Sequence, residues 1–208
     1  MAAAALGAGL TAGYLKVVRP WTLRWGTTEE EAARPLPGDG LVRTADFAAT
    51  RAITVGAAPE KVWPWLVQIG SGRAGWYSYD RLDNAGRPSA TEIIPGLQQL
   101  KAGDLIPMVA GKDIGVWVKE LEPNRRMLWW DQKGEYSWEW LLEPTAVGTR
   151  LISRLRATRH PWTRRMPYEI VAATGDIIMT RKMMRGIKKR AERPADLDPA
   201  PIGGNPVS

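Results

Sequence analysis

The sequence of 208 residues contains no cysteine, one histidine and one phenylalanine. The lack of cysteine excludes disulfide scaffolds, thiol chemistry and zinc sites built from clustered Cys and His. A serine–histidine–acid relay would depend on His160 alone, which lies in a basic loop and is more typical of a surface group than of a base. The sequence therefore predicts no metal site, no cofactor and no catalytic residue.

Long hydrophobic runs are also scarce. The uncharged stretch Ala2–Leu15 is shorter than the roughly 20 residues that span a bilayer. It also lacks the basic residues that precede the apolar run of a signal peptide. Lys16, Arg19 and Arg24 follow it, so an anchor formed by residues 1–18 would leave the rest of the chain in the cytoplasm. Two alternatives stay open for this segment: an anchor in the cytoplasmic membrane, or a packed helix of a cytoplasmic protein.

Acidic residues are in the minority, with 22 Asp and Glu against 29 Lys and Arg and a net charge of +7. Many basic residues lie between Arg181 and Arg193. This pattern is typical of a solvated helix face, and alternatively of a surface that contacts anionic lipid at the inner membrane. We expect no nucleic-acid partner, because the basic residues do not alternate with aromatic residues in a recognisable module. The sequence makes no prediction of oligomeric state.

Proline and glycine mark the boundaries of the chain's segments. Residues 19–46 read as a connector, in which Thr28 caps a turn that begins with three glutamates. Residues 47–192 contain no linker and are predicted to form one ligand-binding domain. Residues 193–208 are rich in proline and lack an apolar period, so we expect a disordered tail.

Periodicity predicts an α+β fold for residues 47–192. A strand over Thr50–Gly56 is followed by a helix from Pro59 and a short helix over Tyr77–Ala85. Five more strands are then expected, over Asp104–Val109, Gly115–Leu121, Arg126–Asp131, Tyr136–Leu142 and Thr149–Thr158, and a helix of about 25 residues over Arg165–Arg190. Short connections favour an antiparallel sheet. Trp138 and Trp140 alternate with polar residues, so one face should be covered by the long helix and the other should face water.

The segment TRAITVGAAPEKVWPWLVQIGSGRAGWYSYDRLDNA (residues 50–85) resembles the opening of the START-like superfamily. Within it, the chain is similar to the polyketide cyclase/dehydrase and lipid-transport-like (SRPBCC) proteins of actinobacterial type. RPWTLRWGTTEEEAARPLPGD (residues 19–39) and LQQLKAGDLIPM (residues 97–108) are similar to the same group.

The resemblance implies a helix-grip fold, in which a seven-stranded antiparallel sheet wraps around a long C-terminal helix and encloses an apolar cavity. Only six strands are apparent in the sequence, so a seventh is expected around Thr91–Ile94. The resemblance also implies binding of a lipid, a polyketide or another bulky apolar molecule, and a minority of relatives are cyclases. It supplies no catalytic motif that maps onto these residues.

Eleven tryptophans and five tyrosines supply the candidate cavity wall. The residues that we expect to contact a ligand lie on the first two helices, two adjoining strands and the inner face of the long helix: Trp63, Trp76, Tyr77, Tyr79, Asp80, Trp138, Trp140, Ser153, Leu155, Ile177 and Met184. Core packing explains the same rings and methionines equally well. The function expected is therefore binding or transport of a small hydrophobic molecule. The alternative is a cyclase or dehydratase that uses cavity Tyr and Asp groups.

Overall fold

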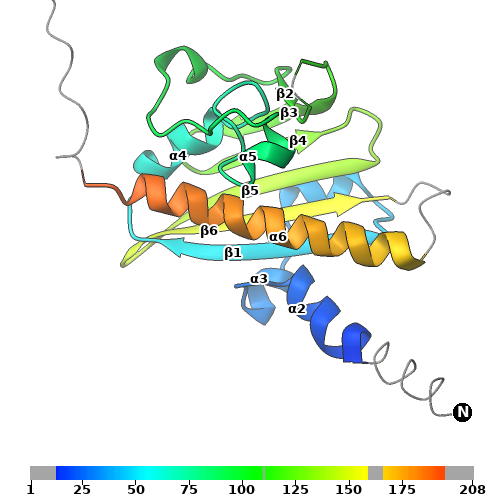
Figure 1. Cartoon of the computed structure of the whole chain (residues 1–208). Helices are drawn as coiled ribbons and strands as arrows, with labels where there is room; N and C mark the ends of the chain where they lie inside the picture. Colours follow the sequence, from blue (N-terminus) through cyan, green and yellow to red (C-terminus); the bar gives the residue numbers. More distant parts are fainter. Residues whose placement is uncertain (1–12, 110, 159–165, 195–208) are drawn as a thin grey trace, which may run out of the picture.

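The computed structural model describes residues 13–109, 111–158 and 166–194. It is an α+β structure, in which a curved antiparallel sheet packs against a long C-terminal helix (Figure 1). In the described residues the sheet has six strands in the order β1-β6-β5-β4-β3-β2. Their bounds are Phe47–Val55 (β1), Leu105–Pro107 (β2), Gly115–Glu122 (β3), Arg126–Trp130 (β4), Tyr136–Thr145 (β5) and Gly148–Ala157 (β6). The fold class and all six strands read from the sequence are confirmed.

Helices and helical turns lie in three groups along the chain. The first group comprises η1 (Tyr14–Val18), at the end of the N-terminal segment, and three elements of the connector: α2 (Arg19–Leu23), α3 (Glu29–Ala33) and η2 (Pro37–Leu41). The second follows β1: α4 (Pro59–Val67), α5 (Asp80–Asp83) and η3 (Pro95–Leu97). The last is α6 (Met166–Ala191), whose 26 residues match the long helix expected. Thr28 caps α3 as expected, because its hydroxyl accepts from the amide of Glu31 while the Glu31 carboxylate accepts from the amide of Thr28.

The hydrophobic core lies between the inner face of the sheet and the helices α4 and α6. α4 begins at Pro59, where the missing N–H has no helical partner to lose, and buries Val62 and Leu66 against the sheet. From β4 and β5, Trp129 and Trp140 point into the same layer and are fully buried. The register of β3 against β4 shifts between Val118 and Glu120, an irregularity of the kind that bends and twists a strand.

The second short helix is much shorter than Tyr77–Ala85. Tyr77 has φ 55° and Ala85 has φ 52°, both in the left-handed region, so a right-handed helix ends before each of them. Only Asp80–Asp83 remains helical.

The seventh strand expected at Thr91–Ile94 does not form. These residues are exposed and have no strand partner. Instead, the buried side chain of Gln68 takes their backbone bonds: its Nε2 donates to the carbonyl of Glu92 at 3.1 Å, and its Oε1 accepts from the amide of Ile94 at 2.9 Å. The side-chain amide of Gln68 thus makes the two backbone hydrogen bonds that a neighbouring strand would otherwise make.

Much of the outer face of the sheet is covered, contrary to the prediction, although Glu120 and Glu143 on this face are exposed at 49% and 39%. Glu139 and Arg154 lie on this face, yet their side chains are only 2% and 6% exposed. The connector covers them: α3 and η2 lie on the face opposite α6, and the chain reaches that face by passing the edge strand β1 (Figure 1). Alternation of polar and apolar residues therefore identified the two faces correctly, but it does not distinguish a solvated face from one covered by a polar segment.

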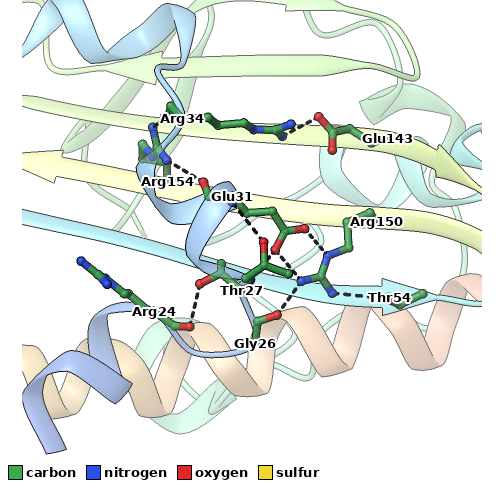
Figure 2. Close-up of polar contacts among 10 residues, drawn as sticks. Arg24, Gly26, Thr27, Glu31, Arg34, Thr54, Glu143, Arg150 and Arg154 are labelled. Carbon is green, nitrogen blue, oxygen red and sulfur yellow. Dashed lines mark hydrogen bonds and ion pairs between the residues drawn. The ribbon is translucent and has the colours of Figure 1, made fainter. Parts of the chain in front are cut away.

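Ion pairs and hydrogen bonds hold the connector on the sheet (Figure 2). Arg150 of β6 makes a two-pronged contact with Glu31 of α3, at 2.7 and 2.8 Å. The guanidinium of Arg154 donates to the carbonyls of Glu31, Ala32 and Arg34 and to the carboxylate of Asp39. Each charged side chain on the covered face therefore has a polar partner, as burial requires.

Three predictions fall on residues that the structure does not describe. They concern His160, the tail from residue 195 onward, and residues 1–12 of the N-terminal segment. Among the helices of the described residues, none is long and apolar enough to cross a membrane.

Candidate ligand-binding cavity

A cavity of about 160 Å³ lies between the sheet and α6. Its apolar wall is built from indole, thioether and leucine side chains: Trp76, Met108, Trp138, Leu155, Met179 and Met183. Its polar wall consists of Ser78, Asp83, Tyr136, Asp176 and Thr180. The mixture of a mostly apolar lining with a few polar groups is typical of small-molecule sites.

Four tryptophans form the floor beside this cavity. Trp76 and Trp138 stack with their planes 4° apart and their ring centroids 5.9 Å apart, while Trp129 meets both edge-on. The indole N–H of Trp138 donates to the hydroxyl of Ser153 at 2.7 Å, which fixes the ring. Trp140 packs against Trp129 and Trp138. Because the rings fill most of the space between sheet and helix, the remaining volume fits one ring-sized molecule and is well below the roughly 300 Å³ at which drug-sized pockets begin.

The polar end of the cavity is organised by Arg51 of β1. Its side chain is 2% exposed, and its guanidinium forms an ion pair with Asp176 at 2.6 Å and donates to the Thr180 hydroxyl at 3.3 Å. Its Nε donates to the carbonyl of Thr22 in α2. One arginine thus orients two cavity residues of α6 and ties them to the connector.

Asp83 presents a different kind of group to the cavity. Its Oδ2 accepts from the amide of Tyr79 at 3.2 Å, whereas its Oδ1 is buried and has no hydrogen-bond partner among the described residues. Burial raises the pKa of Asp83, and the neighbouring carboxylate of Asp80 raises this pKa further. Burial also raises the pKa of the Tyr136 phenol, so that group stays protonated at neutral pH. Because Oδ1 itself has no accessible surface, a ligand donor reaches it only when the Asp83 side chain turns toward the cavity that it lines.

Of the residues selected from the sequence, Trp76, Trp138 and Leu155 line the cavity. Ser153 does not line the cavity, but its hydroxyl accepts the hydrogen bond from the indole N–H of Trp138, which does. The remaining buried residues selected belong to the core and not to the cavity wall: Trp63, Trp140, Ile177 and Met184.

Tyr77, Tyr79 and Asp80 lie elsewhere. The Tyr77 hydroxyl donates to the carbonyl of Trp65 and accepts from Gln68, and burial raises its pKa to about 12. Tyr79 lies at the surface with the ammonium of Lys182 over its ring. Asp80 accepts a hydrogen bond from the hydroxyl of Ser89 and does not line this cavity.

Sequence reasoning missed Arg51, Asp83 and Asp176. Arg51 did carry a signal, because it interrupts the apolar face of a strand that otherwise presents Ala49, Ile53 and Val55. Nothing in the local pattern marks Asp83 or Asp176, which come to the cavity only through the packing of α5 and α6. Among the described residues no group of three or more His, Asp or Glu side chains could hold a metal ion.

No family model matches the chain, and no curated protein matches it. Solved structures with a similar fold include protein MLL2253 from Mesorhizobium loti, at 16% identity, 69% coverage of this chain, 96% of that chain and a TM-score of 0.42. Protein CV1439 from Chromobacterium violaceum is 13% identical, with coverages of 71% and 99% and a TM-score of 0.41. The Polyketide_cyc-like protein Cgl2372 from Corynebacterium glutamicum is 16% identical, with coverages of 69% and 86% and a TM-score of 0.34.

Proposed function

We propose that this chain is a binding protein for a small, ring-sized apolar molecule that carries a hydrogen-bond donor. The cavity beside Trp76 and Trp138 supports this proposal, because its lining is mostly apolar while the Asp83 carboxylate at its wall has an oxygen with no partner among the described residues. A ligand hydroxyl or amine would supply the missing donor, and its ring would lie against the indole and methionine side chains. A sterol or a polycyclic polyketide would need these walls to move apart, since the cavity holds about 160 Å³.

The proposal is tested by titrating the full chain with phenol, benzyl alcohol and benzylamine, and with benzene as the ligand without a donor, while tryptophan fluorescence is recorded. We expect saturable changes with the three donors and at least tenfold weaker binding of benzene, because only the donors satisfy Asp83. Native mass spectrometry of protein purified from its own host would identify a retained ligand. An empty protein together with no saturable fluorescence change would contradict the proposal.

Two adjacent residues of α6 supply a matched pair of variants. Met179 lines the cavity, whereas Ile178 is 49% exposed and does not. Met179→Ala should weaken binding of the aromatic alcohols about five- to tenfold through lost contact with the ring. Ile178→Ala should leave binding unchanged. Equal effects of the two substitutions would place the ligand elsewhere.

A second candidate is acid–base catalysis on the bound molecule, of the cyclase or dehydratase type. It is favoured by the raised pKa of Asp83 at the wall of the cavity. Tyr77, Tyr79 and Asp80, the acid–base groups chosen from the sequence, do not line this cavity. New product masses in incubations of the chain with polyketide-like substrates, absent with Asp83→Asn, would favour the enzyme over the binding protein.

A further inference from the structure

A second hollow, of about 320 Å³, lies on the surface between α6 and the loop around α5. Four basic side chains of α6 line it, namely those of Lys182, Arg185, Lys189 and Arg190. Spacings of three and four residues place Lys182, Arg185 and Lys189 on one side of the helix, and Arg190 lies four residues after Gly186 of the same lining. The hollow shares only Ser78 with the apolar cavity, so it is a separate site.

The protein neutralises only part of the positive charge in this hollow. In the described part of the chain, no ion pair joins Lys182, Arg185 or Lys189 to a carboxylate. Asp80 is the one carboxylate in the lining, where it accepts from the hydroxyl of Ser89 and attracts Arg190, while Asp83 attracts Lys182 from beside the hollow. Four cations against these two carboxylates leave a concave surface with an excess of two positive charges, which attracts anions.

The hollow is also held in shape before anything binds. Arg190 donates from Nε to the carbonyl of Ala90 at 2.8 Å and from Nη1 to the carbonyl of Gly186 at 3.1 Å. Its guanidinium lies 4.3 Å from the centre of the Tyr77 ring. A fixed guanidinium loses little conformational entropy when it binds an anion.

We propose that this hollow binds the phosphate group of a small molecule or of a lipid headgroup. A phosphate dianion neutralises the excess charge better than one carboxylate does, and guanidinium groups match its oxygens two at a time. The volume exceeds that of a bare phosphate, so room remains for the group that bears it. This site goes beyond the proposed function, because the residues that bind the ring-sized ligand are not involved.

The test uses the full chain and isothermal titration calorimetry with pyrophosphate and phenyl phosphate, with benzoate as the carboxylate of similar size. Co-sedimentation with phosphatidylglycerol vesicles forms a second arm. The variant Arg185→Gln/Lys189→Gln removes two exposed cations from the hollow. The variant Lys61→Gln/Lys133→Gln removes the same charge from exposed sites outside it and serves as the control.

We expect pyrophosphate and phenyl phosphate to bind at least tenfold more tightly than benzoate. The hollow variant should lose at least tenfold in affinity, and the control should stay within twofold of the original chain. Binding of soluble phosphates identifies a small-molecule site, whereas binding of vesicles alone, lost in the hollow variant only, identifies a lipid headgroup. No saturable binding in either arm, equal binding of benzoate, or equal losses in the two variants would overturn the proposal. Unchanged binding of aromatic alcohols by the hollow variant keeps this result separate from the first cavity.

Discussion

Two glutamates between the connector and the sheet, Glu31 on the connector and Glu139 on β5, have pKa values shifted in opposite directions. The hydrogen bonds from Arg150 lower the pKa of Glu31 below its ordinary value of 4.5. Burial raises the pKa of Glu139, although the amide of Gly38 and the guanidinium of Arg126 partly offset this effect. In the folded chain, protonation of Glu31 is therefore disfavoured, whereas that of Glu139 is favoured, relative to the unfolded chain.

This difference predicts opposite pH dependences for two single substitutions. Glu31 contributes stability that is present above pH 4.5 and lost as the pH falls, so Glu31→Gln should cost about 2 kcal/mol at pH 7 and progressively less below pH 4.5. Glu139 contributes stability that is present at low pH and lost as the pH rises above 4.5. The free energy of unfolding of Glu139→Gln should therefore rise relative to that of the original chain between pH 4.5 and 7. Urea unfolding monitored by tryptophan fluorescence from pH 4 to 8 measures both differences. Parallel curves would show that the connector does not bury these carboxylates.

At the scale of one element, α6 contains two glycines in different surroundings. A Cβ on Gly186 would lie 2.4 Å from the carbonyl oxygen of Tyr77, so the close approach of helix and loop depends on its absence. A Cβ on Gly175 would meet no atom of the described residues within 4 Å.

The same substitution should therefore have opposite signs at the two positions. Gly186→Ala should lower the free energy of unfolding by about 2 kcal/mol, because Tyr77 and α6 must move apart. Gly175→Ala should raise it by up to about 1 kcal/mol through helix propensity. Thermal melts followed by circular dichroism compare the two variants. Stabilisation by both would mean that α6 does not pack on the Tyr77 loop as described.

At the scale of the whole molecule, the connector protects an edge of the sheet. β1 is an edge strand, and the amide of Ala52 in its middle donates to the carbonyl of Trp25 at 3.0 Å. The opposite edge, β2, is only three residues long and ends at Pro107. Both edges are therefore poor templates for pairing with another chain.

Removal of residues 1–45 should open the β1 edge and the face that bears Arg154 and Glu139. We expect a loss of about 4 kcal/mol, equivalent to a fall in Tm of about 10 °C, together with self-association through β1. Differential scanning calorimetry and sedimentation velocity measure the two effects. A truncated chain that stays monomeric with an unchanged Tm would rule out a protective role of the connector.

The sequence predicts much of this fold because its strands and long helix depend on local patterns. Alternation in β5 and β6 and the apolar period of α6 identify the layers without knowledge of partners. The covered outer face could not be predicted, since Arg150 and Glu31 are 119 residues apart and their contact exists only in the folded chain. The polar wall of the cavity could not be predicted for the same reason, because Arg51 and Asp176 are far apart in the sequence and form their ion pair only in the folded chain. The strand expected at Thr91–Ile94 is absent because Gln68 bonds this backbone with its side chain, and a pattern of strand-forming residues does not reveal such a contact.

Ser78 belongs to the walls of both hollows, and its hydroxyl bonds the carbonyl of Met179. If both proposed ligands bind, this shared wall is where the two sites could be coupled. Whatever factor a bound phosphate then applied to the affinity for an aromatic alcohol, the alcohol would apply to the affinity for phosphate. Titrations with one class of molecule, repeated in the presence of the other, measure that factor, and a factor of one shows that the two sites are independent.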